Sequence, residues 1–483
     1  MKPTVETLPG AVDGTGLFSF FLEDPYPFFL DSGIDNERLS RFSFIGSDPF
    51  LVFSSKGSEC RVQVKHDEKT SYDIRGNPLV QLQKLMQHYN QPSNSAGEAI
   101  PFCSGGAAGY FSYDLGRFLE NLPDRAEDDL NLPDCYFAFY DRAVVIDHCR
   151  EETHLVSTGL PQKGNKKEER RDQRCRELRQ RINRYFQSPP SCTPGTSGLN
   201  KGSTALPAGS NLQSNFDRPG YLEAVRKVQE YIKEGKIEQI NLSQRMQAEL
   251  HSSPWDLYLR LRRLNPAPFA AYLEYPEFTV ASSSPERFLL QRGSRIETCP
   301  IKGTRRRGST PVEDQHLKEE LWNSPKERQE LALIANLEKE ELERACREGT
   351  VQIEELYRLE SYATVHHLVS TVSGLLPETQ NLLDVLPYTF PGGSITGTPK
   401  KQAMEIIEEL EPHRRGVYTG SLGFIDFQGW ADLNVVIRTF IIKGNQAYIQ
   451  VGGGLLEDSN PEEEYQETLD KAKALLDALG FQV

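Results

Sequence analysis

Residues 281–304 read ASSSPERFLLQRGSRIETCPIKGT, and this stretch decides how the chain is interpreted. Apolar and polar residues alternate over 295–301, as in a half-buried β-strand, and a Gly-Ser turn separates this segment from an earlier apolar strand. A three-residue loop centred on Ser294 would place Glu286 opposite Lys302, with Cβ atoms about 5 Å apart. A carboxylic acid and an amine at that separation can act as an acid and a nucleophile.

Two other interpretations of this pair remain open from the residues alone. The pair is an ordinary cross-strand ion pair, or a register shifted by one residue puts the two side chains on opposite faces of the sheet. The combination of SSSPERF with PIKGT resembles the chorismate-binding domain of aminodeoxychorismate synthase component I, a relative of anthranilate and isochorismate synthases. The resemblance spans nearly the whole chain, most strongly 217–475. It implies an α+β fold in which antiparallel β-sheets stack with helices on the outside.

The composition is that of a globular protein with 483 residues, of which 37% are hydrophobic and 26% charged. No apolar run is long enough to span a bilayer, and the first residues lack the apolar core of a signal peptide. The eight cysteines include no CxxC pair, so we expect reduced thiols in a cytoplasmic protein. The formal net charge of −14 argues against nucleic acid or an anionic membrane as partner. A dicarboxylate such as chorismate would therefore need a locally positive pocket.

Length and composition predict three segments. Residues 1–156 form a β-rich first domain, and 157–215 combine a charged, solvated helix with a linker rich in Ser, Pro, Gly and Thr. Residues 216–483 form the second domain. The segment GGAAGYFSYD at 105–114 is similar to the GYxxYD segment of the family, although glycines that allow close strand packing explain it equally well.

One group of residues resembles the amino-acid effector pocket in which anthranilate synthases bind feedback tryptophan. An aspartate stands where the feedback-regulated enzymes usually have glutamate, so a structural contact between domains is the preferred interpretation. The residues are Leu30, Asp31, Ser32 and Arg41 of the first domain and Pro268 and Phe269 of the second.

Two distant helices each offer carboxylates. Residues 326–346 are strongly helical, and Glu330 lies in the middle of an apolar stripe that includes Leu333 and Ile334. An unpaired carboxylate is costly there, so it needs either a metal ion or a buried salt bridge. The last helix is expected over 461–479, with Asn460 as its N-cap.

On that last helix Glu464, Glu467 and Lys471 share one face, which by itself is typical of a solvated surface. Carboxylates from two helices would suit Mg²⁺, which takes oxygen ligands and keeps several waters. The resemblance assigns Glu330 and Glu467 as Mg²⁺ ligands, with Glu464 close by. The family commonly reads KDRAEH…VDLxRND, whereas this chain has KERQEL and then NLEKEE, so a histidine and two aspartates are replaced.

The resemblance also places residues around the substrate. A glycine-rich loop, PGGSITGTPK at 391–400, leads into a helix whose first N–H groups favour anions. In isochorismate synthases the residue that matches Gln239 is a water-activating lysine, and glutamine removes that role. Arginine suits a carboxylate because its planar fork binds both oxygens. The substrate-binding set is Gln239, Thr304, His367, Tyr418, Arg438, Gly452, Gly453, Gly454 and Lys471.

Lys302 distinguishes the activities within the family, because anthranilate synthases carry alanine in PIAGT. The resemblance implies that Lys302 adds to C2 of chorismate while Glu286 protonates the leaving C4 hydroxyl, and that ammonia then forms 4-amino-4-deoxychorismate, a precursor of 4-aminobenzoate and folate. The chain has no GxCxGxQ elbow, so we expect a separate glutamine amidotransferase to supply ammonia. Two rivals remain: anthranilate synthase component I, and a non-catalytic paralogue that binds chorismate or an amino acid.

Overall fold

The computed structural model describes most of the chain, and the statements below concern that part only. Most of the predicted linker, residues 189–210, and with it Cys192, lies outside it. The described residues are 3–32, 39, 41–65, 70–90, 100–188, 211–362 and 365–481.

Two antiparallel sheets of twelve strands each form the framework within the described residues. Neighbours in the first sheet follow the order β1 (Thr4–Pro9), β10 (Glu152–Ser157), β9 (Arg142–Asp147), β3 (Phe42–Gly46), β2 (Phe28–Asp31), β13 (Phe269–Glu274), β14 (Thr279–Ser284), β23 (Thr439–Lys443), β24 (Gln446–Leu455), β12 (Gln239–Glu249) and β11 (Gln213–Ser214), with β20 (Gly397–Thr398) also on β12.

The second sheet follows the order β17 (Ile301–Arg306), β19 (Val365–Leu375), β16 (Arg295–Cys299), β15 (Arg287–Arg292), β22 (Trp430–Val435), β21 (Ser421–Asp426), β7 (Gly106–Phe111), β8 (Cys135–Tyr140), β4 (Leu51–Lys56), β5 (Glu59–Val64) and β6 (Tyr72–Arg75), with β18 (Gln352–Ser361) also on β19. Each sheet therefore contains strands from 1–156 and from 216–483, and the two segments share both sheets.

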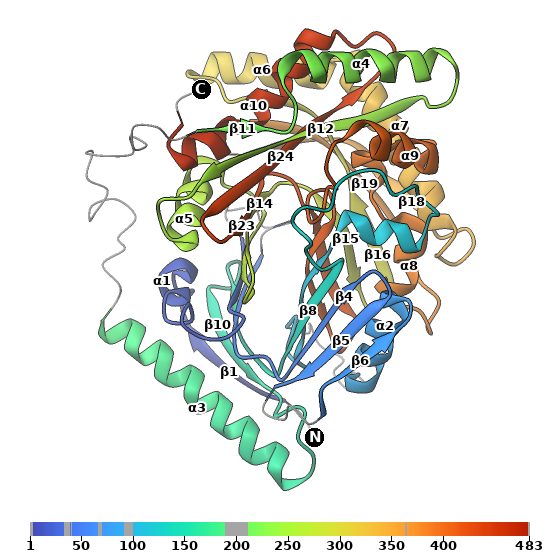
Figure 1. The fold of residues 1–483 in the computed structure, drawn as a ribbon. Helices are drawn as coiled ribbons and strands as arrows, with labels where there is room; N and C mark the ends of the chain where they lie inside the picture. Colours follow the sequence, from blue (N-terminus) through green and yellow to red (C-terminus); the bar gives the residue numbers. More distant parts are fainter. Residues whose placement is uncertain are drawn as a thin grey trace.

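Helices cover the outer faces of the two sheets (Figure 1). α3 runs outside β1, β9 and β10, and α4 and α10 lie over β12 and β24, whereas α7 packs on β17, β18 and β19. The helices are α1 (Gly14–Phe18), α2 (Pro78–Tyr89), α3 (Asn165–Gln187), α4 (Arg218–Lys233), α5 (Pro254–Leu264), α6 (Pro311–Asn323), α7 (Pro325–Glu343), α8 (Leu382–Thr389), α9 (Lys400–Leu410) and α10 (Pro461–Leu479), with 3-10 turns η2 (Tyr113–Phe118) and η3 (Gly393–Ile395).

The apolar core has three main layers. Phe44 of the first sheet and Phe424 of the second contact each other in the layer between the sheets, with ring centroids 4.7 Å apart and ring planes tilted by 46°. One outer layer joins the second sheet to α2, α7 and α8, and the other joins the first sheet to α1, α3, α5 and α10. This confirms the predicted α+β fold of stacked antiparallel sheets with helices outside.

Local capping explains why the predicted helices form where they do. α10 has the predicted bounds: the Asn460 side chain accepts from the Glu462 N–H, and the chain leaves the helix at Gly480 with φ of 97°. α4 begins at Arg218, three residues before the apolar pattern that starts at Tyr221, because the Asp217 carboxylate caps the Gly220 N–H. Short polar side chains at these positions satisfy N–H groups that the helix leaves unpaired.

The segment 421–455 turns at 427–429 and at 444–445 but does not remain in one sheet. β21 and β22 belong to the second sheet, while β23 and β24 belong to the first. Residues 436–438 cross between the sheets, and Arg438 has a left-handed backbone with φ of 54°. Non-glycine residues seldom adopt that conformation, and it persists where the surrounding structure imposes it. The crossover therefore fixes the position from which the Arg438 side chain projects.

Candidate active site

The register of the β15–β16 hairpin differs from the prediction. Arg292 pairs with Arg295 around a two-residue turn, and a bulge shifts the register before Arg287 pairs with Cys299. Lys302 belongs to the next strand, β17, where it pairs with Leu368. The predicted three-residue loop centred on Ser294, and the direct opposition of Glu286 and Lys302, are therefore wrong. Pro300 separates β16 from β17, since proline lacks the N–H that a continuous ladder needs.

The side chain of Lys302 nevertheless lies in the same site as Glu286. The charge of Lys302 partly offsets the rise in the pKa of Glu286, so the two groups are electrostatic neighbours. A Cβ atom placed on Gly454 would lie 3.6 Å from Lys302 Nζ, which puts the amine directly over the glycine strand. Among the described residues, no hydrogen bond or ion pair occupies this amine.

Glu286 is a buried acid with only 6% of its surface exposed. Burial raises the pKa of Glu286 to about 7. Two effects act in the opposite direction: the hydrogen bond that Ser394 Oγ donates to Oε1 at 2.7 Å, and the positive charge of Lys302. A carboxyl group with such a pKa is about half protonated at pH 7, where an ordinary glutamate is almost fully ionised. Glu286 is thus suited to protonate a leaving group.

Glu464 and Glu467 converge on Gly453, as the shared helix face predicts. A Cβ atom on Gly453 would lie 3.4 Å from Glu464 Oε2 and 3.4 Å from Glu467 Oε1. Glu464 Oε2 is buried and has no hydrogen-bond partner within the described structure. Lys471 Nζ forms an ion pair with Glu467 at 2.6 Å and donates to the carbonyl of Gly452 at 3.0 Å.

Glu330 is half-buried at the edge of the helix face that packs on the sheet. Leu333 is 40% exposed, so the apolar stripe predicted around Glu330 is wrong in part, although Ile334 is fully buried. Burial raises the pKa of Glu330, Lys302 acts to lower it, and Glu467 adds to the rise. Glu330 is therefore an electrostatic neighbour of both the amine and the α10 carboxylates.

These three carboxylates fit a hard cation by their chemistry. They offer only oxygen donors, and the orphaned Oε2 of Glu464 is a buried acceptor that lacks a partner. Within the described residues no three acidic, histidine or cysteine side chains lie close enough to form a ready-made ligand cluster. Mg²⁺ takes oxygen ligands and can be held by one or two carboxylates, with water or substrate oxygens completing its shell.

His367 and Thr304 are held together by the pairing of β19 with β17. Thr304 Oγ1 and His367 Nδ1 are 2.9 Å apart, and His367 is 4% exposed. Burial, reinforced by the charge of Arg438, lowers the pKa of His367 to about 4. The imidazole is neutral at physiological pH, so it takes part in hydrogen bonds without adding charge.

Arg438 lines a small pocket together with His367. Arg438 is half-buried, and its guanidinium makes no hydrogen bond or ion pair with a described residue. Burial lowers the pKa of Arg438, and the nearby Tyr418 counteracts this. An arginine remains charged nonetheless. A carboxylate ligand would supply hydrogen-bond acceptors for the N–H groups of this guanidinium.

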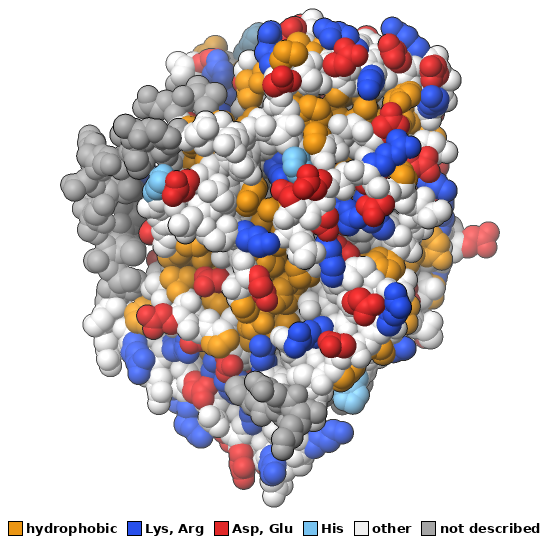
Figure 2. All heavy atoms as spheres, viewed as in Figure 1, with side chains coloured by type: hydrophobic (Ala, Val, Ile, Leu, Met, Phe, Trp, Pro, Cys, Tyr) orange, Lys and Arg blue, Asp and Glu red, His pale blue; other side chains and the backbone are white. Residues whose placement is uncertain are grey.

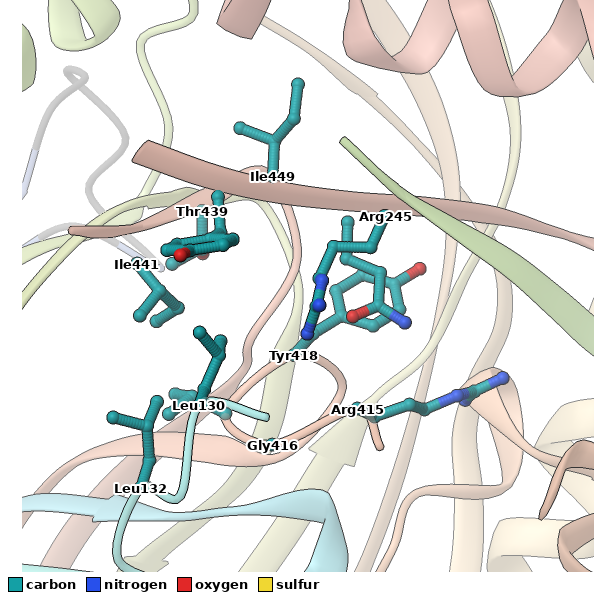
Figure 3. A pocket seen from close by; sticks show the side chains of 12 residues that line it. Leu130, Leu132, Arg245, Arg415, Gly416, Tyr418, Thr439, Ile441 and Ile449 are labelled. Atoms are coloured by element: carbon teal, nitrogen blue, oxygen red, sulfur yellow. The ribbon is translucent and has the colours of Figure 1, made fainter. Parts of the chain in front are cut away.

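Tyr418 belongs to a loop that Arg415 holds in place. Arg415 forms a buried ion pair with Glu411 at 2.8 Å and donates to the carbonyl oxygens of Ile395 and Asn241. Figure 3 shows Arg415 and Tyr418 lining a pocket with Arg245. The same loop is fixed from the first segment, because the Gly416 N–H donates to the Asp114 carboxylate at 2.9 Å.

The glycines Gly452, Gly453 and Gly454 lie at the end of β24. β23 pairs with β24 only as far as Ile449, so in the described structure these glycines pair through β12 alone. One edge of the backbone is open there. A Cβ atom on Gly453 would approach Glu464 and Glu467, whereas one on Gly454 would approach Lys302. Backbone N–H groups on such an edge can bind an anion.

Gln239 is half-buried at the start of β12, where it pairs with Thr398 of the predicted glycine-rich loop. Its side chain makes no hydrogen bond with a described residue. The loop also contributes side-chain contacts. Its Ser394 donates to Glu286, and its Lys400 forms an ion pair with Glu341 at 2.7 Å. The loop therefore orients the acid as well as closing the site.

Sequence reasoning missed several buried polar residues. Glu338 and Glu341 of α7 are 7% and 5% exposed, and Glu338 accepts from Thr298 Oγ1 at 2.9 Å. Glu341 stands where the family motif has an aspartate. Its carboxylate therefore still gives α7 an acidic side chain, which forms the ion pair with Lys400. Their burial could have been suspected only from the helical period, which places positions 334, 338, 341 and 342 on one face.

The residues assigned to an effector pocket do gather, with one exception. Five of them line one pocket between the sheets, whereas Arg41 is not among the lining residues and binds Asp147 at 2.8 Å. Asp31 is buried and accepts from Tyr258 at 2.9 Å and from Arg262. Because Arg262 neutralises Asp31, this pocket offers no free carboxylate from that residue to an amino group. The five are Leu30, Asp31, Ser32, Pro268 and Phe269.

On the face shown in Figure 2, acidic and basic side chains are interspersed. Lys302 and Arg438 make no ion pair with a described residue, so both can offer positive charge to a dianion. No helix of the described chain is long and apolar enough to cross a membrane.

Comparisons with known proteins agree with this geometry. Residues 32–477 match the family model described as chorismate binding enzyme. The chain is 37% identical to aminodeoxychorismate synthase component 1 of Escherichia coli over 481 residues, covering 99% of both chains. It is 36% identical to anthranilate synthase component 1 of Acetivibrio thermocellus over 481 residues, covering 99% of this chain and 94% of that one. The crystal structure of anthranilate synthase component I from Streptococcus pneumoniae TIGR4 superposes with a TM-score of 0.76 at 28% identity, covering 90% of this chain and 92% of that one.

Proposed function

The chain belongs to the family of chorismate-binding enzymes, and we propose that it is an aminodeoxychorismate synthase component I, which converts chorismate and ammonia to 4-amino-4-deoxychorismate. The observation that carries this proposal is the unpaired amine of Lys302, which is an electrostatic neighbour of the buried acid Glu286. A lysine at that place offers a nucleophile, which the alanine of anthranilate synthases does not.

In the first step Lys302, as the neutral amine, adds the lone pair of its nitrogen to C2 of the ring. The two conjugated double bonds shift towards C4, the C4–O bond breaks, and the hydroxyl leaves as water with the proton of Glu286. The pKa of about 7 leaves that proton on Glu286 for donation near neutral pH. The product of this step is a covalent adduct on Lys302.

In the second step ammonia attacks C4 and the double bonds shift back. The bond between C2 and the Lys302 nitrogen breaks, and the lysine leaves as an amine. The Glu286 carboxylate takes a proton from the new C4 ammonium group, which returns the acid to its starting state. The enolpyruvyl group stays on C3, and the overall balance is chorismate and ammonia to 4-amino-4-deoxychorismate and water.

The two carboxylates of chorismate need separate positive partners. The guanidinium of Arg438, with Tyr418 and the open edge at Gly452, Gly453 and Gly454, suits the enolpyruvyl carboxylate. Glu330 and Glu467, with Glu464 close by, would hold Mg²⁺, which when bound supplies positive charge for the ring carboxylate. Lys471 would keep the Glu467 carboxylate oriented through their 2.6 Å ion pair.

Ammonia would come from a separate glutamine amidotransferase subunit. The curated relatives are named as component 1, which implies a second component. The chain has no GxCxGxQ-type segment that would release ammonia from glutamine. It follows that the reaction with glutamine as the nitrogen source depends on a partner of that class.

Anthranilate synthase component I is the second candidate, because the identity to such a relative is nearly the same. Gln239 is compatible with both activities. The two reactions differ in the carbon that receives nitrogen and in the fate of the enolpyruvyl group, which anthranilate formation eliminates. A non-catalytic paralogue would form neither product.

One incubation separates these functions. Purified protein with chorismate, Mg²⁺ and an ammonium salt should form 4-amino-4-deoxychorismate, identified by chromatography, mass and NMR. The same protein with glutamine in place of ammonium should form no product until the amidotransferase is added. Anthranilate as the main product would support the second candidate, and unchanged chorismate would support the paralogue.

Removing a carboxylate from α10 should weaken Mg²⁺ binding. We expect Glu467→Gln to raise the dissociation constant for Mg²⁺ by at least ~10-fold, since changes even outside the ligand set cost ~10–100-fold. Isothermal titration calorimetry with MgCl₂ measures this without turnover. Glu463→Gln, an exposed neighbour on α10, is the matched control and should bind Mg²⁺ as the unmodified protein does. Equal affinity in the two variants would contradict the assignment.

A further inference from the structure

Asn241 of β12 is held in one orientation beside the proposed catalytic groups. It pairs with Gly454 of β24, and its Nδ2 donates to the backbone carbonyl of Ser394 at 2.6 Å. An inverted amide would bring two oxygen acceptors together, so this contact decides which end is nitrogen. The Oδ1 atom is consequently directed away from Ser394.

Asn241 Oδ1 and Lys302 Nζ face the same small space above Gly454. A Cβ atom on Gly454 would lie 3.4 Å from the amide oxygen and 3.6 Å from the amine. Among the described residues, neither atom has another hydrogen-bond partner. The amide oxygen of Asn241 therefore lacks a donor, and the nearby amine of Lys302 lacks an acceptor. Because Gly454 has no side chain, the space beside both atoms is open.

Ser394 connects this arrangement to the acid. Its hydroxyl donates to Glu286 at 2.7 Å, while its carbonyl accepts from Asn241 at 2.6 Å. The backbone at Asn241 is fixed as well, because its carbonyl accepts from Arg415 at 2.7 Å. Asn241 thus belongs to a rigid group of residues that also carries Glu286.

We propose that Asn241 is the positioning residue for Lys302, and that its Oδ1 accepts a hydrogen bond from Nζ and directs the nitrogen lone pair at C2 of the ring. A neutral amine has two N–H groups and one lone pair, so holding one N–H restricts rotation about the last bond of a flexible side chain. The inference rests on the proposed function, since it requires Lys302 to be the nucleophile.

Asn241→Ala should slow the chemistry more than it weakens substrate binding. A misplacement of about 1 Å costs ~10²-fold in rate, so kcat should fall by that amount while KM for chorismate changes little. Without ammonia, formation of the Lys302 adduct, followed by quenching and intact-protein mass, should slow by the same factor. Asn241→Ser makes the same test if the alanine variant does not fold.

The matched control is Gln247→Ala on the same strand, whose side chain binds Gln213 at 2.8 Å. It should form the adduct at the rate of the unmodified protein. Adduct formation at that rate in Asn241→Ala, or a loss confined to KM, would overturn the positioning role alone. If the unmodified protein makes neither the adduct nor the 4-amino product, the proposed function fails and the inference fails with it.

Discussion

Lys302→Ala should lose more than ~10³-fold in the rate of 4-amino-4-deoxychorismate formation, because the variant lacks the nucleophile that forms the covalent adduct. The remaining turnover should shift towards a C2-amino product, since removing the side chain opens the space over Gly454 to ammonia. Product identity and rate are measured together by chromatography and NMR with an ammonium salt in excess.

Lys302→Arg separates charge from nucleophilicity in that experiment. The guanidinium keeps the positive charge that Glu286 and Glu330 experience, but it stays protonated and cannot add to the ring. We expect it to be as slow as the alanine variant in amination while it binds chorismate more tightly. Full activity of either variant with an unchanged product would refute the covalent role of Lys302.

Glu286→Gln should reduce kcat by ~10²–10⁴-fold, the usual contribution of a general acid. The protonated form of Glu286 is the active form, and its pKa is raised to about 7. Activity should therefore fall as the pH rises through about 7, and this alkaline limb should disappear from the profile of the glutamine variant. The profile of kcat against pH, taken with chorismate and ammonium at saturation, measures both effects.

Ser394→Ala is the companion variant for the pH profile. The Ser394 hydroxyl lowers the pKa of Glu286 by its hydrogen bond to the carboxylate, so removing it should move the alkaline limb to higher pH. The same limb in the unmodified protein and in Glu286→Gln would show that another group titrates. An unchanged limb in Ser394→Ala would indicate that Glu286 does not control it.

The fold class and the helices were predictable because they depend on local signals. The Asn460 cap and the apolar period of 461–479 fix α10 without knowledge of the rest of the chain. The split of 421–455 between two sheets was not predictable, because the crossover at Arg438 depends on which strands lie beside it. Periodicity gives the faces of a strand and not its neighbours.

The site was only partly predictable for a similar reason. The residues around Lys302 were identified, but the bulge in β15 and the break at Pro300 changed the pairing that had been used to bring Glu286 near it. Asn241 and Ser394 were missed because their signal is a contact between strand and loop more than 150 residues apart in sequence. Such contacts become visible only once the sheets are assembled.

The most direct test of the covalent mechanism is the mass of the peptide that contains Lys302. Protein incubated with chorismate and Mg²⁺ in the absence of ammonia is quenched, digested and analysed by tandem mass spectrometry. A mass increase equal to chorismate less water, located on Lys302 and lost again when ammonium is added before quenching, is the predicted result. Formation of 4-amino-4-deoxychorismate with no adduct on Lys302 at any time would contradict the mechanism.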